Sequence, residues 1–113
     1  SKATTVIKNL SAEKKQVVLH DLAKDLIKHS DLIIAENQKD LVKMDDADPK
    51  KDRLLLSADR IIGLAKSVNE VAVLEDPTGQ LLSEKTLPNG LKVQKKTVAL
   101  GVVGVIYESR PNV

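Results

Sequence analysis

The apolar run from Val98 to Tyr107 limits the possible folds of this 113-residue chain more than any other feature. In this run, Val-Ala-Leu-Gly-Val-Val-Gly-Val-Ile-Tyr, no polar side chain alternates with the apolar ones. A β-branched strand that is apolar on both faces is typical of a parallel sheet covered by helices on both sides. Such a sheet needs further strands and crossover helices. We therefore expect a buried strand at about 98–107 in a chain that forms the front part of a larger protein.

The sequence before residue 75 has helical patterns instead. Apolar residues at helical spacing predict an amphipathic helix over about 11–28 and a second over about 30–45. The second ends near Pro49, because proline disfavours helical geometry in the residue before it. A third helix is predicted over about 52–73, with Asp52 as its N-cap. Its buried seam steps alternately by four and three residues: Leu54, Ala58, Ile61, Ala65, Val68 and Ala72.

Residues 80–98 are predicted to form a β-hairpin. In the turn sequence Leu87-Pro88-Asn89-Gly90, proline fixes φ near −65° and glycine accepts a positive φ, which suits a type I turn closed by a glycine bulge. Apolar and polar residues alternate after the turn, so this strand is expected to have one wet face. The predicted fold class is α/β, mostly α by content, with N-terminal helices, a hairpin and the first strand of a sheet that is incomplete in this chain.

Composition excludes several classes of function. The formal charge of +2 is too balanced for a nucleic-acid surface, and Tyr107 is the single aromatic residue. No apolar run approaches the roughly 20 residues that span a bilayer, so no membrane partner is expected. The absence of cysteine excludes a disulfide, a cysteine zinc site and a thiol nucleophile within this chain. With no signal-peptide pattern at the N-terminus, we expect a cytoplasmic protein.

Four polar residues, Glu108, Ser109, Arg110 and Asn112, follow the predicted strand. Ligands of open α/β sheets gather beyond the carboxyl ends of the strands. Arg110 offers a planar fork of donors for phosphate or carboxylate, and Ser109 and Asn112 offer neutral hydrogen bonds. Glu108 could accept from a ribose hydroxyl or pair with Arg110. Local sequence alone favours the simpler interpretation, a solvated turn held by a Glu108–Arg110 contact.

Other polar motifs predict no site. His20 and His29 lie too far apart along a helix for one metal, and the acidic stretch 45–48 lacks the glycine and glutamate of a calcium loop. Gly101-Val102-Val103-Gly104 lacks the spacing and helix start of a phosphate cradle, so close packing of a helix is the expected role of its glycines. The pair Lys50-Lys51 is expected to be solubilising surface, and no metal is predicted.

Four stretches of the sequence are informative together, in their order and spacing. They are Asp52-Arg53-Leu54, Asp76-Pro77-Thr78-Gly79, Pro88-Asn89-Gly90-Leu91 and the run from Leu100 to Val113, which ends Gly-Val-Ile-Tyr-Glu-Ser-Arg-Pro-Asn-Val. They resemble the γ-glutamyl phosphate reductase (glutamate-5-semialdehyde dehydrogenase) family of the aldehyde dehydrogenase superfamily. The resemblance covers essentially the whole chain, and its last stretch is highly specific, whereas the other three are weak alone.

The resemblance implies the N-terminal part of a longer, homo-oligomeric enzyme. Family members use NADPH to convert L-glutamyl 5-phosphate to L-glutamate 5-semialdehyde, with release of phosphate, in L-proline biosynthesis. The helices and the strand at 98–107 would belong to a Rossmann-like cofactor domain, and the hairpin would point towards an oligomerisation arm. The family's catalytic cysteine has no counterpart here, so this chain alone is expected to be inactive.

The resemblance also favours a binding role for the polar loop over a purely structural one. In the superfamily the loop after this strand borders the nicotinamide and the reacting carbonyl, which makes Glu108, Ser109, Arg110 and Asn112 candidates for cofactor or substrate binding. Without the resemblance, a non-catalytic helical interaction or oligomerisation module remains the alternative. The small residues in the seam of the third helix and the absence of a local nucleophile motivate that alternative.

Overall fold

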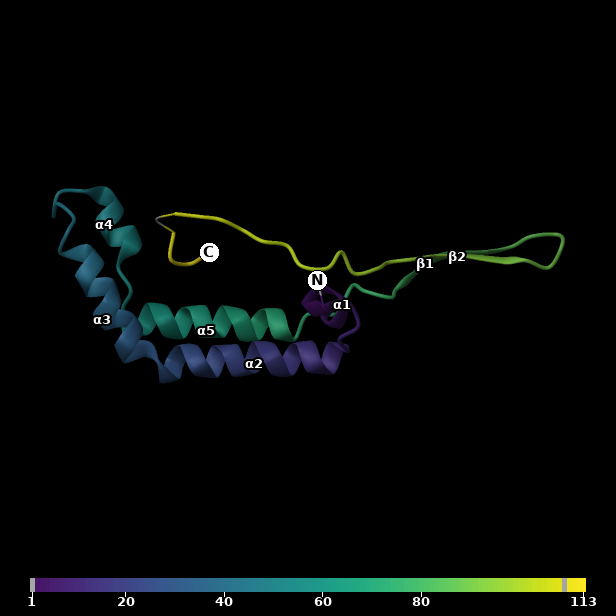
Figure 1. The fold of residues 1–113 in the computed structure, drawn as a ribbon, viewed down its shortest axis with the longest axis horizontal. Helices are drawn as coiled ribbons and strands as arrows, with labels where there is room; N and C mark the ends of the chain where they lie inside the picture. Colours follow the sequence, from purple (N-terminus) through teal and green to yellow (C-terminus); the bar gives the residue numbers. More distant parts are fainter. Residues whose placement is uncertain (1, 109) are drawn as a thin grey trace. The chain divides into compact units, whose positions relative to one another are not determined.

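The computed structural model describes residues 2–108 and 110–113 (Figure 1). The chain divides into two compact units, one containing α1 and residues 75–104 and the other containing residues 13–74 and the C-terminal residues from Val105 onward. Helices predominate, and none of those described is both long and apolar enough to cross a membrane. The elements are α1 (Lys2–Lys8), α2 (Ala12–Lys28), α3 (Ser30–Leu41), α4 (Pro49–Leu54), α5 (Ala58–Ala72), β1 (Leu81–Thr86) and β2 (Lys92–Lys96).

The predicted hairpin is confirmed in the first unit, where β1 and β2 pair antiparallel. The Gly90 amide donates to the Leu87 carbonyl at 2.9 Å, and the Leu87 amide donates to the Leu91 carbonyl at 2.7 Å. Gly90 has φ +87°, which is the left-handed conformation that a type I turn with a glycine bulge requires. Every residue of both strands is exposed, so the expected single wet face is wrong. The reason is that, among the residues that the structure describes, no other element covers either face of the ribbon.

The predicted buried strand at 98–107 is not formed. Residues 98–107 adopt no helix or strand, Leu100 is 89% exposed and Ile106 is fully exposed. A strand needs a partner for its backbone groups, and within the described part of the chain β1 and β2 are the only strands and pair with each other. Within the described residues, the Rossmann-like sheet expected from the resemblance is therefore not formed.

Helix α1, which the sequence analysis did not predict, approaches one of the two glycines in this run. Gly101 has φ +113°, and a Cβ atom there would lie 3.0 Å from Cγ2 of Thr4 and 3.2 Å from Cε of Lys8. Nothing lies within 4 Å of the equivalent position at Gly104. Close helix packing, the role expected for both glycines, is therefore found at Gly101 alone.

The second unit is built on α2, α3 and α5. Three residues of the predicted seam, Ile61, Ala65 and Ala72, are buried on α5, as the alternating steps of four and three predict. The other buried apolar side chains described are Ala23 on α2 and Leu41 on α3. A 2.7 Å hydrogen bond between Nδ1 of His20 and Oδ1 of Asn69 links α2 to α5. The core of this unit is therefore small and dominated by alanine.

The predicted continuous helix over 52–73 is wrong, because α4 ends at Leu54 and α5 begins at Ala58. The N-cap of α4 is Asp48 rather than Asp52, and its carboxylate accepts from the Lys50 amide at 2.9 Å. Pro49 occupies the first helical position, where a missing N–H costs nothing. The proline expected only to end the preceding helix thus also starts the next one, and α3 stops at Leu41 rather than near residue 45.

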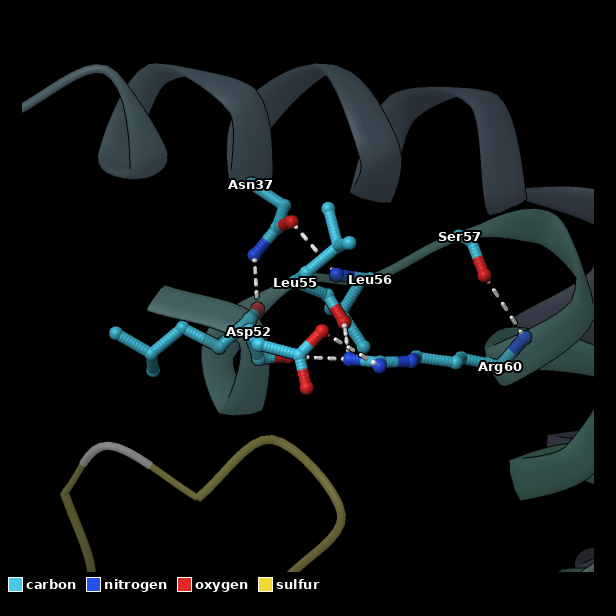
Figure 2. A network of polar contacts seen from close by, with 7 residues as sticks. Asn37, Asp52, Leu55, Leu56, Ser57 and Arg60 are labelled. Carbon is cyan, nitrogen blue, oxygen red and sulfur yellow. Dashed lines mark hydrogen bonds and ion pairs between the residues drawn. The ribbon is translucent and has the colours of Figure 1, made fainter. Parts of the chain in front are cut away.

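Side chains from α3 and α5 hold the α4–α5 linker (Figure 2). The Asn37 amide donates to the Leu54 carbonyl and accepts from the Leu56 amide, both at 2.8 Å. Arg60 donates to the backbone carbonyls of Asp52 and Leu55, and its Nη2 lies 3.1 Å from the Asp52 carboxylate. These bonds satisfy backbone groups that a continuous helix would have paired within itself. The break is therefore a fixed corner that sets the direction of α4.

Replacing Asn37 with alanine is expected to lower the free energy of unfolding of the intact protein by about 1–3 kcal/mol. The cause is that the substitution leaves a part-buried carbonyl and a part-buried amide without partners. Chemical unfolding measures the loss. Asn9→Ala is the matched control, since the Asn9 side chain makes a single exposed bond to the Thr5 carbonyl at 3.0 Å. Equal stabilities for the two variants would contradict a role for Asn37 in holding the corner.

Candidate functional site

The polar loop after Tyr107 forms an exposed turn in the second unit. The Val113 amide donates to the Arg110 carbonyl at 3.1 Å, and Glu108, Arg110 and Asn112 are exposed. Ser109, the fourth predicted site residue, lies outside the described residues. Within residues 2–108 and 110–113, no ion pair joins Glu108 to Arg110. The contact expected from the simpler interpretation is therefore not made, and both charged groups are available to a ligand.

A pocket of about 510 Å³ joins this loop to α4. Its volume lies within the range of small-molecule sites. Glu108, Arg110 and Asn112 line one side, and Lys50 and Arg53 line the other. Lys50 and Arg53 are three residues apart on α4, a spacing that places both on one face of the helix. The structure thus brings Glu108, Arg110 and Asn112 together. It also places beside them two cations, Lys50 and Arg53, that the sequence did not predict as site residues.

The charge of the pocket comes from three cations and one carboxylate. In the described part of the chain, the side chains of Lys50, Arg53, Arg110 and Glu108 form no ion pair with one another or with other residues. Charged side chains that have no ion-pair partner in the protein attract ligand groups of the opposite charge. The pocket is therefore suited to a small anionic molecule that also presents one positive group.

Lys51, the remaining lysine of α4, has a different role. Its ammonium contacts the Asp46 carboxylate, and the hydrogen bond and the charge of Lys51 lower the pKa of that carboxyl. Lys51 does not line the pocket with Lys50 and Arg53. Adjacent residues on a helix point in different directions, so the lysine pair that looked equivalent in the sequence is divided between a surface ion pair and the pocket.

A second pocket of about 440 Å³ shares Arg53 and Asn112 with the first. Its other walls are more apolar and come from Leu55 and Leu56 in the fixed corner, from α5, and from Pro111. Arg60 also lines this pocket, but its guanidinium donates to the carboxylate and carbonyl of Asp52 and to the Leu55 carbonyl (Figure 2). Arg53 and Asn112 are thus the two polar side chains placed at the boundary between a charged pocket and a more apolar one.

Neither histidine takes part in this site. Nδ1 of His20 bonds to Asn69, and Nδ1 of His29 bonds to the Asp25 carbonyl at 2.9 Å. Among the residues that the structure describes, no group of three His, Asp or Glu side chains could hold a metal ion. The chemistry available from the described residues is therefore charge recognition and hydrogen bonding.

Comparison with known proteins places this geometry in context. No family model matches the chain. Over 112 residues it is 52% identical to the gamma-glutamyl phosphate reductase of Legionella pneumophila (strain Lens). The aligned region covers 99% of the chain and 27% of that protein. Over 96 residues it is 54% identical to the gamma-glutamyl phosphate reductase of Chlorobium phaeobacteroides (strain BS1), covering 85% of the chain and 23% of that protein.

The chain is homologous to gamma-glutamyl phosphate reductases. A crystal structure of gamma-glutamyl phosphate reductase from Thermotoga maritima agrees, with a TM-score of 0.91 and 29% identity over 98% of this chain and 28% of that one. The resemblance inferred from the four sequence stretches is therefore confirmed. The chain spans about a quarter of the length of these reductases, and the mostly helical fold with one two-stranded sheet matches a segment of the solved reductase.

Proposed function

We propose that this chain is part of an NADPH-dependent gamma-glutamyl phosphate reductase. The parent enzyme would convert L-glutamyl 5-phosphate to L-glutamate 5-semialdehyde and phosphate in L-proline biosynthesis. The observation that carries the proposal is the 52% identity to a reductase of that name over 99% of the chain. The pocket that Lys50, Arg53 and Arg110 line supports it, because these three cations outnumber the single carboxylate of Glu108 and the substrate is anionic.

In this proposal the chain supplies one wall of the site and the rest of the protein supplies the nucleophile. A cysteine thiolate attacks the acyl carbon, phosphate leaves with the electrons of the C–O bond, and a thioester remains. Reduction of that thioester by a hydride would then release the semialdehyde and restore the thiolate. The loop side chain Arg110 binds the anionic substrate, and Asn112 donates to the carbonyl oxygen that becomes negative during attack.

NADPH, when bound, supplies the hydride, and its cradle is assigned to the remainder of the protein. Gly101 and Gly104 lie in a segment without regular structure, and no helix begins in the described residues that follow them. A pyrophosphate cradle needs a helix N-terminus behind its glycines. The described residues therefore do not fit the dinucleotide phosphates. The homo-oligomeric state of the parent stays a prediction.

The test of the proposal is turnover by the intact parent protein. Semialdehyde, phosphate and NADP are supplied in the reverse direction, and NADPH formation is followed by its absorbance. Phosphate-dependent turnover is the expected result, with NADP preferred over NAD. Oxidation of the semialdehyde that does not depend on phosphate would contradict the proposal, because acyl phosphate formation is the step that distinguishes this reductase from a hydrolytic aldehyde dehydrogenase.

Arg110→Ala in the intact protein is expected to lower kcat/KM by about tenfold or more, which is the usual value of a charge-assisted hydrogen bond. The melting temperature should stay near that of the unsubstituted protein, because the Arg110 side chain is exposed and makes no ion pair among the described residues. Steady-state kinetics and thermal unfolding measure the two effects. An unchanged kcat/KM would return Arg110 to a structural or surface role.

A further inference from the structure

The charged pocket contains one group that does not fit a site for phosphate alone. Lys50, Arg53 and Arg110 would all attract a phosphate, but Glu108 lines the same pocket and repels a dianion. A site evolved only for phosphate gains nothing from an unpaired carboxylate in its wall. The charge pattern instead matches a molecule that carries a carboxylate and an ammonium group close together.

We propose that this pocket binds the α-amino-acid head group of the substrate, so that Arg53 and Arg110 hold the α-carboxylate and Glu108 holds the α-ammonium group. The assignment rests on the proposed function and goes further by naming the substrate end that α4 recognises. A guanidinium pairs with a carboxylate through two parallel N–H donors, and a carboxylate is the natural acceptor for an ammonium group. Lys50 adds a third positive charge beside the carboxylate.

The boundary between the two pockets supports this orientation. Arg53 and Asn112 line both pockets, whereas Glu108 and Arg110 line only the charged one. A substrate whose head group lies at Glu108 and Arg110 therefore has its remaining carbons directed past Asn112. In this orientation the neutral amide of Asn112 lies beside the substrate carbons that lead from the head group to the reacting acyl group.

The fixed corner gives α4 a defined position for this role. Asn37 bonds the backbone of Leu54 and Leu56, and Arg60 donates to the carbonyls at positions 52 and 55. These bonds set the direction of α4 and so the place of Arg53. The caps at Asp48 and Ser57 fix the ends of the two helices that meet at the corner. A specificity residue held on a short, capped helix is better positioned than one on an unsupported loop.

The reverse reaction separates the two ends of the substrate, because semialdehyde and phosphate enter as different molecules. In the intact protein, Arg53→Gln is expected to raise KM for the semialdehyde by about tenfold or more and to leave KM for phosphate within about twofold. Arg53→Lys should recover part of the loss. Lys43→Gln is the matched control, since it removes one positive charge from an exposed lysine near Asp40 that is not among the pocket residues.

Glu108→Gln distinguishes the two possible occupants of the pocket, the amino-acid head group and the phosphoryl group, because they predict KM changes in opposite directions. A head-group site predicts a higher KM for the semialdehyde, because the ammonium group loses its partner. A phosphoryl site predicts a lower KM for phosphate, because a repelling carboxylate is removed. A rise in KM for phosphate alone in Arg53→Gln, or a fall in KM for phosphate in Glu108→Gln, would overturn the proposal in favour of a phosphoryl site. Unchanged constants in both variants would also overturn it.

A binding measurement does not depend on turnover. L-Glutamate is expected to raise the melting temperature of the intact protein more than glutarate does, because glutarate lacks the ammonium group, and Glu108→Gln should remove the difference. Equal shifts with both compounds would contradict the assignment of Glu108. If the unsubstituted protein lacked phosphate-dependent turnover but kept the L-glutamate shift, the proposed reaction would fail while the head-group site stood.

Discussion

In the intact protein, Ile106→Lys and Val105→Lys are each expected to cost more than about 3 kcal/mol of stability, enough to prevent accumulation of folded enzyme. Neighbouring side chains on a strand point to opposite faces, and the apolar run predicts that both faces are covered. In this chain Ile106 is fully exposed and Val105 is 68% exposed, so the expected cost comes entirely from contacts with the rest of the protein.

Ile106→Val and Val42→Lys are the controls for this prediction. The first keeps the apolar character and should cost only about 0.5–1.5 kcal/mol. The second introduces the same lysine at an exposed position, 78% accessible, just after α3. Expression as soluble protein and chemical unfolding measure the effects. A folded Ile106→Lys variant with unchanged stability would show that one face of this segment is open to solvent, and the prediction of a strand buried on two sides would then be wrong.

The elements that could be predicted from the sequence are those stabilised by local interactions. The hairpin turn at 87–90 depends on the φ values of a proline and a glycine within four residues. The seam of α5 depends on a period of three and four residues, which is also local. In both cases the residues that determine the structure are the residues that form it.

The corner between α4 and α5 could not be predicted because its partners are distant in the sequence. The Asn37 side chain, 17 residues before Leu54, stabilises the break, and nothing near Leu54 distinguishes it from the start of the α5 seam. The apolar steps continue across the corner in the sequence, although the helix does not. The prediction of a strand at 98–107 failed for a related reason. Its apolar pattern predicts neighbouring strands, and among the described residues no strand pairs with this segment.

The candidate site shows the same difference between residues that are close in the sequence and residues that are distant in it. Glu108, Arg110 and Asn112 were predicted because they follow an apolar run, although that run forms no strand here. Lys50 and Arg53 were missed because they come from another element more than 50 residues earlier, and a lysine pair on a helix is most often surface. The one available signal was the Asp52-Arg53-Leu54 stretch of the family resemblance, to which no role for Arg53 was attached.

Asn112→Ala in the intact protein is expected to lower kcat by about 10²–10³-fold, with KM for both reverse substrates changed much less. Removing one donor to a developing oxyanion typically has this effect on acyl transfer. An interaction that forms only in the transition state affects kcat, whereas one that also holds the ground state affects KM. The position of Asn112 at the boundary of the two pockets is the structural reason to expect the first behaviour.

Asn112→Asp makes the test sharper, because it keeps the size of the side chain while replacing the N–H donor with a negative charge. Its kcat should fall at least as far as that of Asn112→Ala, since a carboxylate repels the oxyanion. Asn89→Asp is the matched control: Oδ1 of Asn89 accepts from the Leu91 amide at 3.1 Å in the hairpin turn, and aspartate accepts equally well. If Asn112→Asp raised KM for the semialdehyde and spared kcat, Asn112 would be a binding residue of the ground state, and the oxyanion donor would have to come from the remainder of the protein.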